Sequence, residues 1–244
     1  MTNPARPFLN CDLGEDSATP DHLLMPWIAA ANVACGGHAG DHASMRRVVT
    51  LALSHSVRIG AHPSYPDQKH FGRVVLNLSP EALKSSLAAQ ITTLRTIARS
   101  LGTDLTHVKP HGALYHACED PALATLLARV VEATCPHAAL VGRCGSRAVD
   151  TWLRLGRPVW HEAFADRLYL DDGSLAPRSA PGAVIADPDR AASQALRIAQ
   201  GQGAPTASGG SIPLRPTTIC IHSDSPGAAL TAQRVGSALR TLPP

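Results

Sequence analysis

The chain has 244 residues, of which 44% are hydrophobic and 17% charged, with 19 glycines and 20 prolines. This length and composition fit one sizeable α/β core, and we expect a single domain over residues 1–244. No apolar run approaches the roughly 18 residues that a membrane span needs, and residues 1–10 lack the apolar segment of a signal peptide. The net charge of +3 is too small and too scattered to predict nucleic-acid binding. We therefore expect neither a membrane nor a nucleic acid among the partners.

The cysteines and lysines give two further indications. The six cysteines form no CxxC pair or other zinc spacing. Half of them lie in apolar, strand-like runs, where cysteine is usually a small buried residue, and reduced cysteines favour a cytoplasmic location. Basic residues are almost all arginine, apart from Lys69, Lys84 and Lys109. A lysine at one spot in such a chain suggests a need for a compact, titratable ammonium there.

Short strand-like runs alternate with helix-like stretches along the chain. The expected strands, in order, are residues 8–11, 30–34, 57–61, 105–109, 138–142, 158–163 and 217–222. Expected helices begin where a capping residue precedes a proline, at Thr19-Pro20, Ser79-Pro80, Asp120-Pro121, Asp187-Pro188 and Ser225-Pro226. The helix after Ser79 carries apolar residues at helical spacing and stops at Gly102.

Seven strands alternating with helices predict parallel βαβ units, either closed into a barrel or laid out as an open, doubly wound sheet. The sequence has no GxGxxG after its first strand and no GxxxxGK[ST] anywhere. Both absences disfavour the dinucleotide-binding and P-loop folds. We therefore expect an α/β fold, a distorted seven-stranded (β/α) barrel.

Ionisable side chains follow six of the seven expected strands at their carboxyl ends. In a barrel these ends meet at one rim, where barrel enzymes place their chemistry. The pattern therefore predicts an active site at that rim. The polar groups, in chain order, are Asn10 and Asp12, His38 and Asp41, His62, Lys109 and His111, Glu162, Asp166 and Arg167, and His222 and Asp224.

Several of these groups have a structural alternative. Asp12 is a candidate general base or metal ligand, or else a cap of the next turn. His38 lies in a glycine-rich turn whose N–H groups favour anions, and Asp41 either contacts a ligand or caps the following helix. Arg167 either holds a substrate carboxylate bidentately or pairs with Asp166.

Lys109 stands in the most informative stretch, between His107 and His111. Strand alternation puts Lys109 and His107 on one face. If that face is interior, burial lowers the pKa of Lys109 and keeps it available as an acid, a base or a phosphate contact. The alternative is a surface lysine.

Four of the strand-end groups are also of the types that bind divalent metals, namely Asp12, His38, His62 and His222. No two of them stand at the interval of a metalloprotease motif or a zinc finger. The sequence therefore assigns no metal ligand.

Taken together, the motifs resemble the LamB/YcsF family. They lie at residues 9–15, 31–41, 60–67 with 71–73, 107–115, 162–178 and 219–226, and the resemblance runs from Leu9 to about Leu239. Some positions depart from the family pattern. Gly37 stands where a bulky residue is expected, Ser64 and Ser223 replace glycines, and His42 replaces proline or a small polar residue. Residues 201–216 have no clear counterpart and are expected to form a variable loop.

The resemblance implies a seven-stranded barrel related to those of glycoside hydrolases and polysaccharide deacetylases. It also implies a reaction: the lactam of 5-oxo-L-proline opens to L-glutamate, coupled to hydrolysis of ATP with Mg. The implied partners are two further subunits of that 5-oxoprolinase, B and C. Because no Walker motif is present, two places for the ATP site remain open: an atypical site on this chain, or a site at the junction with the partners.

A mechanistic hypothesis assigns roles to the rim groups. A lactam is a poor electrophile, and phosphorylating its carbonyl oxygen eases attack by water but needs positive charge around the transferring group. Lys109 and His38 would supply that charge, Arg167 would hold the substrate carboxylate, and Asp12 or Glu162 would activate water. The catalytic candidates are Asp12, His38, His62, Lys109, His111, Glu162 and His222. Among these, His62, His111 or His222 would move protons. The substrate-binding candidates are Asn10, Asp41, Arg73, Asp166, Arg167 and Asp224.

Two other functions remain open at this point. One is a metal-dependent hydrolase of amide or acetyl bonds that acts alone and without ATP. The other is a non-catalytic subunit that binds 5-oxoproline and presents it to a catalytic partner.

Overall fold

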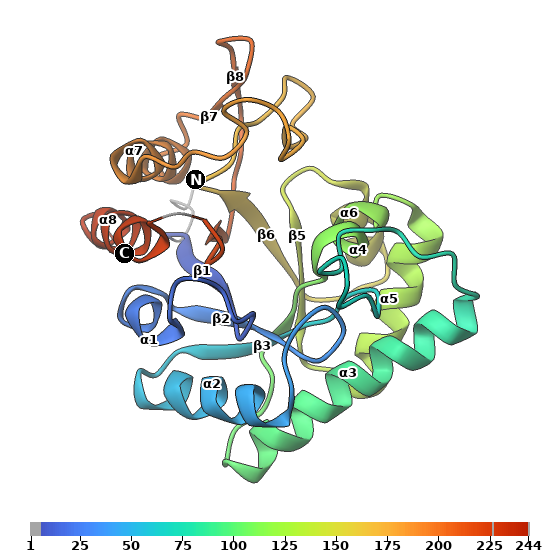
Figure 1. Ribbon diagram of the computed structural model, residues 1–244. Helices are drawn as coiled ribbons and strands as arrows, with labels where there is room; N and C mark the ends of the chain where they lie inside the picture. The colour runs from blue at the N-terminus through green and yellow to red at the C-terminus, as the bar shows by residue number, and fades with distance from the viewer. Residues whose placement is uncertain (1–5, 226, 244) are drawn as a thin grey trace. The chain divides into compact units, whose positions relative to one another are not determined.

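Seven strands close into a barrel in the order β1-β2-β3-β4-β5-β6-β9, as the alternation of strands and helices predicts (Figure 1). The computed structural model describes residues 6–225 and 227–243. The barrel strands are β1 (Phe8–Leu13), β2 (Ala30–Ala34), β3 (Arg58–His62), β4 (His107–Val108), β5 (Ala139–Arg143), β6 (Val159–Phe164) and β9 (Thr218–Ile221). Neighbouring strands such as β2 and β3 pair in parallel. The expected fold class is confirmed.

Helices connect the strands. They are α1 (Asp21–Leu24), the 3-10 helix η1 (Met25–Trp27), α2 (His42–Ser54), α3 (Pro80–Ser100), α4 (Gly112–Ala117), α5 (Pro121–Thr134), α6 (Arg147–Arg154), α7 (Pro188–Ala199) and α8 (Ala228–Arg240). Three predicted starts are confirmed, because Ser79, Asp120 and Asp187 each accept a hydrogen bond from a backbone N–H of the first turn. Each is followed by a proline, whose missing N–H costs nothing at the first helical position.

Two other predicted helix starts are wrong. Pro20 has an extended ψ of 135°, so it caps α1 from outside and the helix begins one residue later. The last helix begins at Ala228, with Gly227 rather than Ser225 as its cap. Gly227 has a φ of 73°, a left-handed conformation that glycine adopts readily. Pro226, which the sequence predicts at the first helical position, lies outside the described residues.

The chain packs as two compact units, and the single domain expected over residues 1–244 stays a prediction. The first, called here the β2–β5 unit, comprises Asp12–Asp16 and Ala30–Trp160. Its helices lie outside its strands, with the long helix α3 packed against α2 and α5 (Figure 1). The apolar face predicted for α3 is buried, for example at Leu87 and Leu94, and each such side chain stabilises the core by roughly 1.5–3 kcal/mol.

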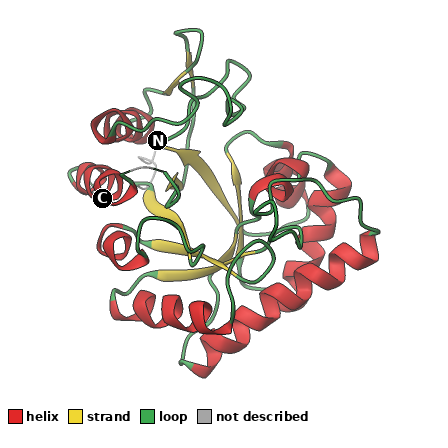
Figure 2. Ribbon diagram, viewed as in Figure 1, coloured by secondary structure: helices red, strands yellow, loops and turns green. Residues whose placement is uncertain are grey.

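The second, called here the β9 unit, comprises residues 6–11, 17–29, 161–225 and 227–243. In it, α7 packs against α8 (Figure 2). The segment expected as a variable loop contains a short antiparallel hairpin of β7 (Ala204–Pro205) and β8 (Ser211–Ile212). The sequence does not predict this hairpin, since each of its strands has only two residues.

Within the part of the chain that the structure describes, no helix combines the length and apolar character needed to cross a membrane.

Candidate active site

A buried ion pair joins Asp12, near the end of β1, to Lys109, which directly follows β4. Nζ of Lys109 lies 2.9 Å from Oδ1 of Asp12, and the two side chains are only 3% and 6% exposed. Asn32 of β2 donates a hydrogen bond to the same carboxylate oxygen at 2.7 Å. Lys109 is therefore an interior lysine rather than a surface one, and its ammonium is held against the Asp12 carboxylate.

Asn32 is in turn oriented by His107 of β4. The amide oxygen of Asn32 lies 2.8 Å from Nε2 of His107. Burial lowers the pKa of His107 to about 3, so the ring is neutral and donates from Nε2 to the amide oxygen. The Asn32 amide group is thus fixed with its N–H directed at Asp12. Sequence reasoning missed Asn32, although an asparagine inside an apolar strand was a signal available to it.

His62, the last residue of β3, also contacts this carboxylate. Its Nε2 lies 3.4 Å from Oδ2 of Asp12, while its Nδ1 lies 2.7 Å from the carbonyl oxygen of Lys109. Burial disfavours the charged imidazolium, but the Asp12 carboxylate outweighs burial and raises the pKa of His62. His62 is therefore the histidine of this group that most readily holds a second proton.

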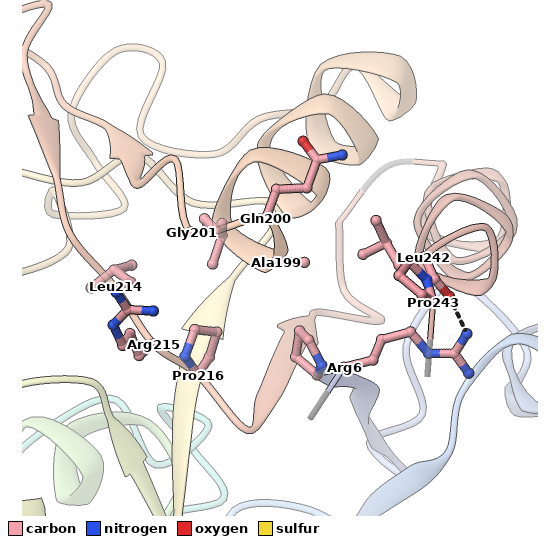
Figure 3. Close-up of a pocket in the computed structure, with 11 residues that line it drawn as sticks. Arg6, Ala199, Gln200, Gly201, Leu214, Arg215, Pro216, Leu242 and Pro243 are labelled. Carbon is pink, nitrogen blue, oxygen red and sulfur yellow. Dashed lines mark hydrogen bonds between the residues drawn. The ribbon is translucent and has the colours of Figure 1, made fainter. Parts of the chain in front are cut away.

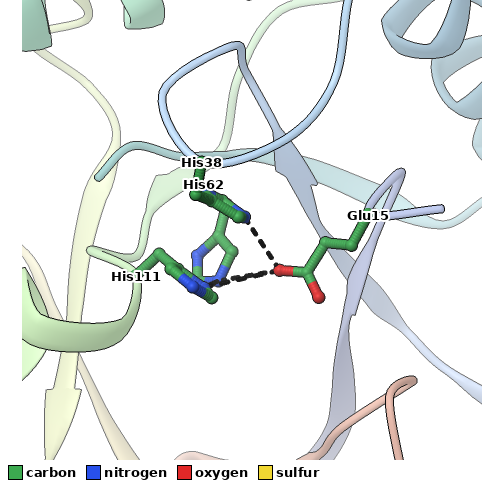
Figure 4. A group of neighbouring side chains, drawn as sticks. All are labelled: Glu15, His38, His62 and His111. Carbon is green, nitrogen blue, oxygen red and sulfur yellow. Dashed lines mark hydrogen bonds and ion pairs between the residues drawn. The ribbon is translucent and has the colours of Figure 1, made fainter. Parts of the chain in front are cut away.

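Four side chains, Glu15, His38, His62 and His111, form what we call the histidine cluster (Figure 4). One ligand-type atom from each lies within 4.8 Å of those of the others. Oε1 of Glu15 is 3.0 Å from Nε2 of His38, 3.4 Å from Nδ1 of His111 and 3.7 Å from Nε2 of His62. All four residues are buried. Sequence reasoning missed Glu15, which lies in the turn after β1, three residues beyond Asp12.

The cluster keeps two of its rings neutral. Burial lowers the pKa of His38 to about 2, with the charge of His62 adding to the effect. Burial and the same charge hold the pKa of His111 well below its usual range. The rings of His38 and His111 stack with centroids 3.6 Å apart, and two cations so close would repel each other. Close packing fixes this stack, because a Cβ on Gly72 would lie 2.9 Å from Cβ of His38.

Gly37, which precedes His38, is closely packed against Ser64 and Gln90. A Cβ on Gly37 would overlap the hydroxyl of Ser64 and the side-chain oxygen of Gln90. Gln90 of α3 is itself held by the backbone of Ser64, at 3.0 Å from its nitrogen and 2.9 Å from its oxygen. The serine therefore occupies the volume that a larger residue at position 37 would need.

The other predicted residues of the β2–β5 unit have local partners. Asp41 caps α2, accepting from the backbone nitrogen of Ser44 at 2.7 Å. Arg73 is exposed, with its Cζ 5.0 Å from the ring centroid of Phe71. The substrate-binding roles of Asp41 and Arg73 stay predictions.

In the β9 unit, two predicted residues lie together on β1 and β6. The side-chain nitrogen of Asn10 donates to Glu162 at 3.2 Å and to the hydroxyl of Thr218 at 2.7 Å. Both Asn10 and Glu162 are almost fully buried. Their roles in substrate binding and catalysis also stay predictions.

The buried Asp166 contacts the partly exposed His222 in the β9 unit. The carboxylate of Asp166 accepts from the backbone nitrogen of His222 at 2.9 Å and lies 3.0 Å from its Nδ1. Arg167, by contrast, donates to the carbonyl oxygens of Ala176 and Ala183, at 2.7 and 3.3 Å. Its guanidinium thus supports the loop that follows β6, and the predicted grip on a substrate carboxylate stays a prediction.

Asp224, the last predicted substrate-binding residue, is paired with Arg178. The guanidinium of Arg178 lies 3.0 and 3.3 Å from the two carboxylate oxygens of Asp224. This ion pair is partly exposed. It links the loop before α7 to the segment that follows β9.

A pocket in the β9 unit contains none of the predicted site residues. It is lined by residues that precede β1 and β9, by the carboxyl end of α7 and by the segment after α8, including Arg6, Gln200, Arg215 and Leu242 (Figure 3). In barrels the amino ends of the strands serve stability, whereas the carboxyl ends carry chemistry. The pocket is therefore not the candidate active site.

Comparison with known proteins agrees with the family resemblance of the sequence motifs. The model of the LamB/YcsF family matches residues 8–242. A protein from Chloroflexus aggregans, named as the A subunit of 5-oxoprolinase, is 45% identical over 229 residues, which cover 92% of this chain and 91% of that protein. A protein of the same name from Streptomyces avermitilis is 42% identical over 239 residues, which cover 95% and 94%.

Solved structures agree on the fold. The lactam utilization protein from Thermus thermophilus matches with a TM-score of 0.90 at 38% identity, over 97% of this chain and 96% of that one. A GH20 β-N-acetylhexosaminidase from Streptomyces coelicolor matches with a TM-score of 0.53 at 10% identity, over 96% and 64%. This second likeness concerns the fold alone, and it shows that the barrel resembles a glycoside hydrolase barrel in its architecture.

Proposed function

Because this chain belongs to the LamB/YcsF family, we propose that it is the A subunit of a 5-oxoprolinase and opens the lactam of 5-oxo-L-proline to L-glutamate. The observation that carries the proposal is identity of 41–45% to proteins named as that same subunit, over more than nine-tenths of the chain. The fold, with its buried charged groups at strand ends, supports a catalytic rather than a structural role.

The Asp12–Lys109 pair supports the chemical step. Hydrolysis adds a water oxygen to the lactam carbonyl carbon, breaks the C–N bond and delivers a proton to the leaving nitrogen. Asp12 would accept the proton of the attacking water on its Oδ2 atom. This is the carboxylate oxygen that lies on the side of the histidine cluster, where it contacts His62. Lys109, 2.9 Å from Oδ1, would stabilise negative charge that develops on the carbonyl or phosphoryl oxygens.

ATP coupling is the finer part of the proposal. ATP, with Mg, would phosphorylate the lactam carbonyl oxygen and leave as ADP, which makes the carbonyl carbon a better electrophile. Water would then add to that carbon, the C–N bond would break with a proton going to nitrogen, and a second water would release the phosphate to give glutamate. The word "subunit" in the relatives' names supports an assembly, and subunits B and C would be the partners. The six cysteines are buried and form no disulfide within the described residues, which supports function in the reducing cytoplasm.

A second candidate is a metal-dependent amide hydrolase that acts alone. The histidine cluster favours it, because three imidazoles and a carboxylate are ligands typical of hydrolytic metal sites.

One assay separates the candidates. Glutamate release from 5-oxoproline is measured with the purified chain, with and without Mg-ATP, and again after addition of subunits B and C. Release that requires both ATP and the partners supports the oxoprolinase. Amide hydrolysis by the chain alone, without nucleotide, supports the second candidate. No glutamate from a complex shown to be assembled refutes the 5-oxoproline assignment.

A further inference from the structure

Two ring nitrogens in the histidine cluster face each other with no hydrogen atom available between neutral rings. Nδ1 of His111 lies 3.0 Å from Nε2 of His62. The far nitrogen of each ring contacts a backbone carbonyl: His62 reaches that of Lys109 at 2.7 Å, and His111 that of Phe71 at 2.9 Å. A carbonyl oxygen can only accept, so each far nitrogen carries the ring hydrogen. In the neutral rings, both near nitrogens therefore present bare lone pairs to each other.

The remaining two members of the cluster direct donor atoms at the same region. Oε1 of Glu15 lies 3.4 Å from the near nitrogen of His111 and 3.7 Å from that of His62. Nε2 of His38 lies 3.0 Å from the same oxygen, and Nδ1 of His38 is buried without a hydrogen-bond partner among the described residues. Four atoms of metal-ligand type thus converge in a buried space (Figure 4). Lone pairs so close repel one another unless a proton or a metal ion lies between them.

The spacing of the donors suits one small metal ion. Tetrahedral zinc, with ligand distances of about 2.0–2.2 Å, separates neighbouring ligand atoms by about 3.3–3.6 Å. Four of the six donor-to-donor separations in the cluster are 3.0, 3.0, 3.4 and 3.7 Å, and all six lie within 4.8 Å. Small side-chain adjustments would bring all four donors to bonding distance without moving the strands.

We propose that Glu15, His38, His62 and His111 bind one divalent transition-metal ion of the zinc class. Three imidazole nitrogens select such ions over Mg²⁺ and Ca²⁺, which prefer oxygen ligands. The carbonyls of Lys109 and Phe71 are the hydrogen-bond partners that metal-binding histidines usually have on their far nitrogens. Of the four strand-end groups whose types suit a metal, His38 and His62 belong to the proposed site, and Glu15 and His111 stand in place of Asp12 and His222.

The site changes the roles open to the histidines. As ligands, His38, His62 and His111 would not carry protons, and the base next to the ion would be Asp12, 3.4 Å from Nε2 of His62. Metal binding by the chain alone does not depend on the proposed substrate. A failure of the 5-oxoproline assignment would therefore leave this site standing, and the reverse also holds.

The test is direct binding of Zn²⁺ to the full chain. Metal content is measured in freshly purified protein, and the chelator-stripped chain is then titrated with Zn²⁺ by calorimetry, with Co²⁺ as a spectroscopic probe. We expect one ion per chain and a higher Tm in the presence of the ion. Absence of saturable one-to-one binding by the wild-type chain would overturn the proposal and leave a shared proton between His62 and His111 as the explanation of their contact.

Variants locate the site. Glu15→Gln keeps the side-chain shape and removes the charged oxygen, and His38→Ala removes one imidazole. Each should weaken Zn²⁺ binding by more than about 100-fold, since loss of a hydrogen-bond partner behind a ligand alone costs about 10- to 100-fold. His42→Ala, at an exposed histidine, is the matched control and should bind as the wild type does. Wild-type affinity in both Glu15→Gln and His38→Ala would show that the ion binds elsewhere and would overturn the assignment.

Discussion

Replacing Lys109 with methionine isolates the energetic role of the buried pair. The substitution removes the ammonium, keeps most of the apolar stem, and leaves the Asp12 carboxylate in a site where the side chain is only 6% exposed. Breaking a buried pair on one side typically costs about 3–5 kcal/mol. Because Asp12 keeps the hydrogen bond from Asn32 at 2.7 Å, we expect the lower end, about 3 kcal/mol. In a chain of this size, that loss lowers Tm by about 6–12 °C.

The assay is thermal and urea unfolding in the presence of a chelator, so that bound metal does not contribute. Lys84→Met on α3 is the matched control: Lys84 is exposed, and its loss should change stability by less than about 0.5 kcal/mol. The double variant Lys109→Met/Asp12→Asn should recover part of the loss, because the carboxylate is then no longer left without its partner. A loss below about 1 kcal/mol in Lys109→Met would refute the buried-pair interpretation.

Two further variants probe packing and pH. Gly37→Ala should lower the free energy of unfolding by about 1–3 kcal/mol through overpacking. In urea unfolding, the double variant Gly37→Ala/Ser64→Gly should recover part of this loss, because the serine hydroxyl no longer occupies the space. Simple additivity of the two single changes would contradict this coupling between positions 37 and 64. Burial raises the pKa of Asp166, but the contacts with His222 outweigh burial and lower it. This carboxylate therefore stabilises the fold at pH values above its unfolded pKa near about 4, and the contribution is lost as pH falls through the folded pKa. The difference in free energy of unfolding between wild type and Asp166→Asn should therefore shrink as pH falls from about 6 to about 3. A difference independent of pH would contradict a stabilising role of the ionised Asp166.

Features encoded locally could be predicted from the sequence. Apolar runs located all seven barrel strands to within two residues at each end, although β4 extends over only His107–Val108. Pro110 cannot donate to a strand ladder and follows closely behind β4. Capping by Ser79 depends only on its own helix, and its prediction is confirmed.

Features that depend on the tertiary fold could not be predicted. Glu15 lies in a turn rather than at a strand end, so only the folded chain reveals that it meets three histidines. Asn32 was visible as an asparagine within an apolar run, but its role depends on His107 from a strand far along the chain. The start of α8 was missed because the left-handed backbone of Gly227, not the Ser225-Pro226 signal, sets its first turn.

The most direct test of the account is the turnover of the assembled 5-oxoprolinase complex with Asp12→Asn in this chain, with Lys84→Met as the control. The account predicts that kcat for glutamate release falls by at least about 100-fold, the usual contribution of a general base, while the control is unaffected. Unchanged turnover by Asp12→Asn, in a complex shown to be assembled, would contradict it.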